Sequence, residues 1–248
     1  MPSNTDFLLA IEDLTVSFDG FKAVDDLTLY VDKGELRVII GPNGAGKTTV
    51  LDLISGKTKS SAGSIRYNNK EITKMREHEI VRLGIGRKFQ TPSIYDKLTV
   101  FENLEISYPQ GRSINGSLGF KRTDKVVKRI LEVAEEIFLI DLLDLEAELL
   151  SHGQKQWLEI GMLLVQDPEL VMLDEPVAGM TAKERDETAI LLKKMAKERS
   201  VIIIEHDMDF VAKIADRVTV LHLGKILKEG TMEEVQSDPT VKEVYLGH

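Results

Sequence analysis

Eight residues near the N-terminus have the types and spacing that bind phosphate. They read Gly41-Pro42-Asn43-Gly44-Ala45-Gly46-Lys47-Thr48 and are followed by Thr49. Glycines let the backbone wrap closely around an anion with its amides pointing inward, and the N-terminus of a following helix adds partial positive charge. Lys47 can reach the β- and γ-phosphates, Thr48 can ligate Mg²⁺ through its hydroxyl, and Thr49 is a further candidate contact. This segment therefore predicts a site for ATP with Mg²⁺.

Two carboxylates follow an apolar run, Leu170 to Leu173, that reads as a buried strand. Asp174 is expected near Mg²⁺, through a water molecule, and Glu175, one residue on, can polarise the attacking water as a general base. Taken alone, the pair is about as compatible with a solvated acidic turn. The phosphate-binding segment upstream favours catalysis.

A third segment reads Leu150-Ser151-His152-Gly153-Gln154 and precedes a helical pattern from Lys155 to Ile160. Ser151, Gly153 and Gln154 at a helix N-terminus offer a hydroxyl and free amides to a phosphate, although Ser151 could also be an ordinary N-cap. Here the chain resembles the ABC ATPases, whose signature reads L-S-G-G-Q, with His152 in place of a glycine. The resemblance implies that this segment closes over the γ-phosphate bound to a second subunit.

The same resemblance implies roles for three residues elsewhere in the chain. Gln90, in Lys88-Phe89-Gln90-Thr91-Pro92, matches the glutamine that touches Mg²⁺ or the lytic water. His206, after the run Val201 to Ile204 and Glu205, matches the histidine that contacts the γ-phosphate. Phe18, before Asp19-Gly20, matches the aromatic that stacks on adenine, whereas a core phenylalanine is the common alternative.

The loop after Glu175 departs from the family pattern. It reads Pro176-Val177-Ala178-Gly179-Met180, where many relatives carry S-A-L-D. The aspartate that communicates across the dimer in those relatives is therefore missing, and Met180 is given no catalytic role.

The resemblance covers nearly the whole chain and points to a subgroup. The motifs around Gln90 and Ser151, the loop at Val177 and the ending Val244-Tyr245-Leu246-Gly247 look like branched-chain amino acid and amide importers, and within these like the urea-type ATPase. That implies a peripheral ATPase at the cytoplasmic face of the membrane. Its expected partners are an identical or paralogous ATPase, transmembrane permease subunits and, indirectly, a solute-binding protein, with no nucleic acid.

Three alternatives stay open at this point. One is an ATPase for export of lipid or polysaccharide, and another is a soluble ABC protein acting in translation or DNA repair. Such soluble relatives usually carry two cassettes or a long coiled coil, and this sequence has neither. An unrelated P-loop kinase is disfavoured by the Ser151 segment and by the adjacent Asp174 and Glu175.

The elements that must position these residues follow from the hydrophobic pattern. Alternating apolar residues predict strands over residues 8–18 and 27–31, and a strand over 36–40 should lead through the glycine-rich loop into a helix that buries Val50, Leu51, Leu53 and Ile54. Strands at 170–173 and 201–204 are separated by a helix over 182–199, and 218–228 reads as a hairpin. Residues 96–149 look mostly helical, with Thr123 preceding an apolar stripe and a loop at 110–119. The members of that stripe are Val126, Val127, Ile130, Leu131, Ala134, Ile137 and Phe138.

Together these features predict an α/β fold. With the resemblance, they imply a P-loop NTPase (RecA-like) core, an N-terminal antiparallel β subdomain and a helical ABC subdomain. Residues 1–248 form one ATPase domain, in which 1–94 and 159–248 are the nucleotide-binding core and 95–158 the helical subdomain.

Composition narrows the functional classes further. The 248 residues carry a net charge of −9, which argues against a nucleic-acid binder, and the absence of cysteine excludes disulfides, thiolate metal sites and a cysteine nucleophile. The longest apolar runs are far shorter than the ~20 residues that a membrane-spanning helix needs. Any role at a membrane is therefore expected to work through partner subunits.

Overall fold

A computed structural model describes residues 7–88, 94–109 and 122–246 of the chain. Its contacts divide into two compact units. The first comprises 1–87, 169–176 and 192–248, and the second comprises 88–168 and 177–191. The functional boundaries expected at residues 95 and 158 stay a prediction.

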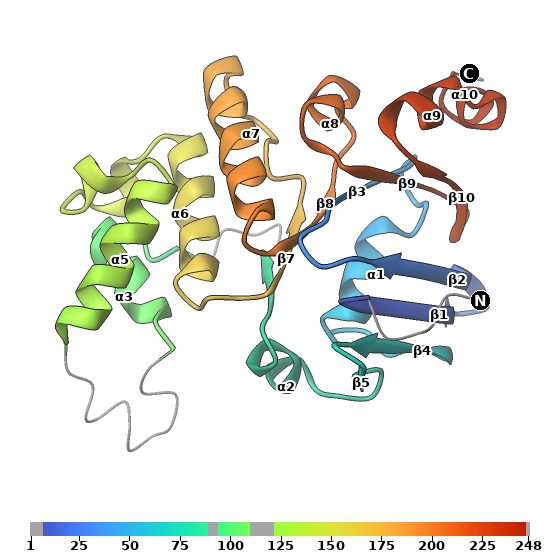
Figure 1. Ribbon diagram of the computed structural model, residues 1–248, viewed down its shortest axis with the longest axis horizontal. Coiled ribbons are helices and arrows are strands. Elements are labelled where there is room, and N and C mark those ends of the chain that lie inside the picture. Colours follow the sequence, from blue (N-terminus) through green and yellow to red (C-terminus); the bar gives the residue numbers. More distant parts are fainter. Residues whose placement is uncertain (1–6, 89–93, 110–121, 247–248) are drawn as a thin grey trace. The chain divides into compact units, whose positions relative to one another are not determined.

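The first unit contains two β-sheets (Figure 1). The antiparallel sheet has the order β2-β1-β4-β5, formed by β1 (Leu9–Phe18), β2 (Phe21–Val31), β4 (Ala62–Tyr67) and β5 (Lys70–Glu71). The predicted N-terminal strands are confirmed, and β2 begins earlier than predicted. The antiparallel β subdomain is thereby present.

The second sheet has the order β10-β9-β3-β8-β7-β6 and holds the candidate catalytic residues at strand ends. Its strands are β3 (Leu36–Ile40), β6 (Ile85–Lys88), β7 (Leu170–Asp174), β8 (Ser200–Ile204), β9 (Arg217–His222) and β10 (Lys225–Gly230). Strand β3 runs parallel to β8 and β9, and β7 runs parallel to β8, whereas β9 and β10 form the predicted hairpin. Because the carboxyl ends of parallel strands share one edge, the loops after β3, β7 and β8 meet there.

A hydrophobic core of the first unit is shared by both sheets and helix α1 (Lys47–Ile54). The helix buries Val50, Leu51, Leu53 and Ile54, as the sequence predicts. These side chains pack with apolar residues of β1, β2, β3, β7 and β8. The helix that follows the glycine-rich loop is thereby fixed in place by its own apolar face.

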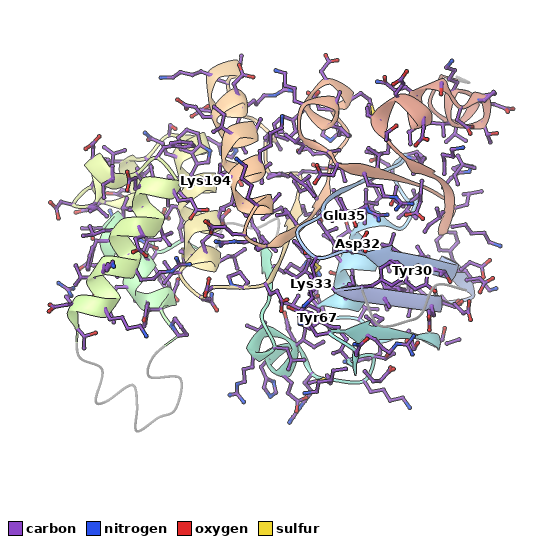
Figure 2. The ribbon with its side chains drawn as sticks, viewed as in Figure 1. Tyr30, Asp32, Lys33, Glu35, Tyr67 and Lys194 are labelled. Atoms are coloured by element: carbon purple, nitrogen blue, oxygen red, sulfur yellow. The ribbon has the colours of Figure 1, made fainter. Side chains whose placement is uncertain are left out.

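A buried arginine adds polar contacts between the two sheets. Arg37 of β3 is 1% exposed and donates to the Tyr30 carbonyl at 2.8 Å and to Thr219 Oγ1 at 2.8 Å. It also pairs with Glu35 and Glu229. Figure 2 labels Tyr30 at the end of β2 and Glu35 just before β3, which mark this region of the unit. A fully paired guanidinium of this kind satisfies its own buried charge.

Four short helices of the first unit have no counterpart in the sequence-based prediction. They are α2 (Glu77–Arg82), α8 (Met208–Ile214), α9 (Met232–Ser237) and α10 (Pro239–Leu246). The helix α7 (Ala182–Ala196) is confirmed and ends three residues before the predicted end. Its last residues, from Leu192, belong to the first unit and its earlier residues to the second.

The second unit is helical, as predicted. It contains α3 (Val100–Ser107), α5 (Asp124–Glu136), the 3₁₀ turns η1 (Ile140–Leu142) and η2 (Ala147–Leu149), and α6 (His152–Leu164). Thr123 caps α5 by accepting from the Val126 amide. The predicted loop at 110–119 lies outside the described residues.

The predicted apolar stripe of α5 is confirmed in part. Val126, Ile130, Ala134 and Ile137 are buried, and so is Val133, which the prediction omitted. The prediction was wrong at Leu131 and Phe138, which are 38% and 41% exposed because Leu131 faces away from the packed side and the helix has already ended at Phe138. Within the described part of the chain, none of the helices combines the length and apolar character required to cross a bilayer.

Candidate nucleotide-binding site

The glycine-rich loop has a backbone that few other residues could adopt. Gly41 and Gly46 have φ of 154° and 101°, and a Cβ at either would lie 2.3 Å from the Leu221 carbonyl oxygen or 2.4 Å from that of Ala23. Gly44, at φ 78°, has open space where a Cβ would stand, and Asn43 beside it is exposed. The loop is therefore tightly held on one side and accessible at its tip.

Helix α1 begins directly from this loop. Its N-cap is Gly46, which offers no side-chain cap, and the residues of its first turn are Lys47, Thr48 and Thr49. The first amides of a helix lack intrahelical partners, so an anion can bind them. Thr49 lies in this turn as the sequence predicts, and its role as a phosphate contact stays a prediction.

The Lys47 side chain folds over the loop. Its Nζ donates to the Gly41 carbonyl at 2.7 Å and to the Pro42 carbonyl at 3.0 Å. Burial lowers the pKa of Lys47, while the nearby carboxylates of Glu175 and Asp174 oppose that change. A phosphate offered to this ammonium would supply the charge partner that the two neutral carbonyls do not.

The structure brings Thr48 and Asp174 together from segments far apart in sequence. Thr48 Oγ1 donates to Asp174 Oδ2 at 3.1 Å, at the carboxyl end of β7. The other oxygen, Asp174 Oδ1, is buried and has no hydrogen-bond partner among the described residues. Burial raises the pKa of Asp174, with Thr48 opposing the change and Glu175 adding to it. Hydroxyl and carboxylate oxygens are the donors that Mg²⁺ prefers, so these two residues fit that ion.

Glu175 has a backbone conformation that is unusual for its residue type. Its φ is 48°, in the left-handed region, and its amide donates to the Ile204 carbonyl at the end of β8. Its Oε1 lies 3.7 Å from His206 Nδ1, and His206 is largely exposed. Non-glycine residues in this region are often found at functional sites, because the surrounding structure must hold them there. Glu175 and His206 are thus neighbours, each just after the end of its strand.

Phe18 ends strand β1 with an exposed ring. Its side chain is 49% exposed, which excludes the alternative of a core phenylalanine. Its partner across the β1–β2 hairpin is Phe21, which is also exposed. Strand β2 of this hairpin touches the phosphate-binding loop, since Gly46 approaches the carbonyl of Ala23. Stacking on adenine remains a prediction for Phe18.

The signature segment caps helix α6 of the second unit. Ser151 Oγ accepts from the Gln154 amide at 3.2 Å, and Gln154 Oε1 accepts from the Ser151 amide at 2.9 Å, which is a capping box. Gly153 is buried against Glu184, whose carboxyl carbon would lie 2.4 Å from a Cβ there. The ordinary capping role of Ser151 is therefore real, and a phosphate contact by Ser151, Gly153 or Gln154 stays a prediction. Gln90 lies outside the described residues.

Arg87 is a site residue that sequence reasoning missed. It is buried in β6, donates to Ser55 Oγ at 2.8 Å and pairs with Asp52 at 2.6 Å, which joins β6 to the far end of α1. Its charge also opposes the rise in the pKa of Asp174. A charged residue inside a buried strand, next to Ile85 and Gly86, was the available signal.

Comparisons with known proteins agree with this geometry. A family model described as "ABC transporter" matches residues 24–178, and one described as "Branched-chain amino acid ATP-binding cassette transporter" matches residues 229–248.

Two curated relatives match along nearly their whole length. A probable branched-chain amino acid transport ATP-binding protein, LivG, from Archaeoglobus fulgidus is 37% identical over 97% of this chain and 95% of its own. The high-affinity branched-chain amino acid transport ATP-binding protein BraF of Pseudomonas aeruginosa is 34% identical over 97% of this chain and 98% of its own.

A solved structure matches the fold as well. The ADP conformation of MJ1267, an ATP-binding cassette of an ABC transporter, superposes with a TM-score of 0.86 at 34% identity and covers 98% of this chain and 99% of that one. The predicted P-loop NTPase fold is confirmed. With the phosphate-binding loop, the strand-end carboxylates and the signature segment all present, the chain belongs to the ATP-binding cassette family of ABC transporter ATPases.

Proposed function

We propose that this chain hydrolyses MgATP as one half of an ATPase dimer that powers import of a small polar solute, with branched-chain amino acids as the solute class. The observation that carries the proposal is the meeting of Lys47, Thr48 and Asp174 at the ends of β3 and β7. An ammonium, a hydroxyl and a buried carboxylate there match what a triphosphate with its metal ion requires.

The residues of the loop bind and orient the triphosphate. Lys47 exchanges its two carbonyl partners for β- and γ-phosphate oxygens, and the amides of Lys47 and Thr48, in the first turn of α1, are available to the same oxygens. Thr48 and Asp174 would hold Mg²⁺, and Asp174 Oδ1, unpaired among the described residues, supports that assignment. Bound there, Mg²⁺ supplies positive charge against the phosphate oxygens.

Glu175 is the general base that accepts the proton of the attacking water. Glu175 follows β7 directly, and its backbone is in the left-handed region. His206, 3.7 Å from the carboxylate of Glu175, is placed to contact the γ-phosphate. Catalysis of this kind consists of positioning and charge stabilisation, without a covalent intermediate.

A count of motifs supports the dimer. The sequence has one phosphate-binding loop and one signature segment, and these lie in different compact units. In the proposal, Ser151 and Gly153 of one subunit cover the γ-phosphate held by Lys47 of the other. The second subunit is an identical copy or a paralogue.

The solute class rests on relatives and not on any residue of the site. Branched-chain amino acid transport is named for the Archaeoglobus and Pseudomonas relatives, and the C-terminal family model carries the same description. The urea-type subgroup stays a prediction. Permease subunits would bind near Gln90 and the helical region, at the cytoplasmic face of the membrane, with a solute-binding protein beyond them.

A substitution of the general base tests this proposal. Glu175→Gln keeps the shape of the side chain and cannot take a proton, so we expect ATP binding to persist, turnover to fall by about 10²-fold or more, and an ATP-dependent dimer to accumulate in size-exclusion chromatography. Glu132→Gln, on the exposed side of α5, is the matched control. Lys47→Ala should instead abolish ATP binding. Ordinary turnover in Glu175→Gln would remove that residue from the base role.

A further inference from the structure

The signature segment is bound by side chains to the loop that follows Glu175. Ser151 Oγ donates to Glu184 Oε1 at 2.8 Å, and the other oxygen of that carboxylate accepts from the Thr181 amide at 2.9 Å and the Thr181 hydroxyl at 2.8 Å. One carboxylate therefore joins the cap of α6 to the cap of α7. These three contacts lower the pKa of Glu184, which keeps it ionised.

His152 makes the second connection. Its Nε2 lies 3.0 Å from the Ala178 carbonyl oxygen. A carbonyl can only accept, so the ring must carry its proton on Nε2 and donate it. The ring also lies against Gly179, where an added Cβ would stand 3.2 Å from Nε2 and where φ is 73°. The residue that replaces a family glycine thus packs on the loop that lacks the family aspartate.

The rest of the loop is anchored inside the same unit. Met180 is buried, with its sulfur 3.2 Å from Thr188 Oγ1, and Trp157 Nε1 donates to that same oxygen at 2.8 Å. Met180 therefore packs inward, where the aspartate of relatives would have to reach a second subunit. Signature helix, loop and the start of α7 form one block.

The block begins immediately after the candidate base. Val177 belongs to the compact unit of the signature segment, while Glu175 and Pro176 belong to the unit of the phosphate-binding loop. Glu175 itself is in the left-handed region, with its amide held by the Ile204 carbonyl. Only two peptide bonds separate Val177, the first residue of the block, from the strained backbone of Glu175. A displacement of the block would therefore act on Glu175.

We propose that His152 is a positioning residue that couples the two ATP sites of the dimer. This inference rests on the proposed function. When the Ser151 hydroxyl donates to the γ-phosphate held by the second subunit, it no longer donates to Glu184. The signature segment then shifts. His152 passes that shift to Ala178 and so to the Glu175 of its own subunit. ATP bound at one site thereby positions the general base, Glu175, of the other site. Hydrolysis is therefore positively cooperative in ATP.

The test compares His152→Ala with His152→Gln in the full-length chain. Wild-type turnover should rise with ATP concentration with a Hill coefficient above 1, whose ceiling is about 2 for two sites. In His152→Ala we expect a coefficient near 1 and a kcat several-fold lower, with ATP binding unchanged. His152→Gln, whose amide can still donate to Ala178, should restore part of the cooperativity. Lys155→Ala, on the same helix but paired with Asp96, is the control.

A second measurement tests the coupling role of His152 separately from the proposed ATPase function. In the Glu175→Gln background, the His152→Ala chain should still form the ATP-dependent dimer, because Lys47 and Ser151 are intact. If that dimer forms and His152→Ala turns over ATP with the wild-type Hill coefficient, the coupling role is wrong while the proposed function stands. If Glu175→Gln with His152 intact forms no dimer, the proposed function itself fails. A wild-type coefficient of 1 would also overturn the coupling.

Discussion

Thr48 Oγ1 donates to Asp174 Oδ2 at 3.1 Å, which joins the first turn of α1 to the carboxyl end of β7 across 126 positions of sequence. The second oxygen of Asp174 is buried without a hydrogen-bond partner in the described part of the chain. The carboxylate is thus held where its charge is costly to the folded protein and useful to a bound cation.

This cost predicts that Asp174→Asn stabilises the protein while it abolishes turnover. Burial raises the pKa of Asp174 above its ordinary value, so the folded state disfavours the ionised form at pH 7. The penalty is absent below the ordinary carboxyl pKa and grows as pH rises through the raised pKa. The Tm of Asp174→Asn, measured without nucleotide, should therefore exceed that of the wild type at pH 7 and approach it near pH 4.

The control for this prediction is Asp141→Asn, an exposed position in η1. It should leave both Tm and turnover unchanged. A lower Tm for Asp174→Asn at pH 7 would mean that the carboxylate stabilises the fold, contrary to the assigned direction.

Two exposed phenylalanines of the β1–β2 hairpin allow a matched test of adenine stacking. Phe18 and Phe21 are opposite residues in the register of the two strands, and both are exposed. Loss of one stacked aromatic costs about 1–3 kcal/mol per base, so Phe18→Ala should weaken ATP binding by about tenfold or more. Phe21→Ala should leave ATP affinity unchanged. Equilibrium dialysis with labelled ATP measures both.

The affinity for inorganic triphosphate distinguishes a loss of adenine stacking from a general change in the nucleotide-binding site. Triphosphate lacks the base, so its affinity should be the same in Phe18→Ala and wild type. Equal losses for ATP and triphosphate would show that the substitution disturbs the phosphate-binding loop instead.

The motifs whose chemistry is local in sequence could be predicted closely. Strand β3 and the buried face of α1 match the prediction because the glycine-rich loop fixes where one ends and the other begins. The two carboxylates after β7 follow from a strand apolar on both faces. Each of these signals lies within one continuous segment of the chain.

Contacts between distant segments could not be predicted. Glu184 meets Ser151 across 33 positions and His152 meets Ala178 across 26, and nothing in the local pattern of α7 marks its first turn as a partner of the signature. The stripe of α5 failed at Leu131 and Phe138 because only the packed unit decides which flank of an apolar face is covered. Arg87 was missed for the same reason, since Asp52 becomes its partner only on folding.

A buried ion pair just before the Gln90 segment yields a prediction about stability. Lys88 ends β6 and its Nζ lies 3.1 Å from Glu159 Oε2 in α6, with the two side chains 3% and 6% exposed. Removing Lys88 takes its positive charge away from the buried Glu159 carboxylate, and breaking a buried ion pair costs about 3–5 kcal/mol. Lys88→Met should therefore lower the free energy of unfolding by that amount, as measured from urea denaturation at pH 7.

Two further variants distinguish loss of the ion pair from general damage to core packing. The double variant Lys88→Met with Glu159→Met removes both charges, and a hydrophobic replacement of a whole buried pair is often neutral. It should be more stable than Lys88→Met alone, which is a non-additive result because the two side chains are in contact. Lys97→Met breaks the exposed pair of Lys97 with Glu148 and should leave the urea midpoint unchanged. If the double variant were less stable than Lys88→Met alone, the loss would come from packing, and the charges of the pair would not be what stabilises this part of the second unit.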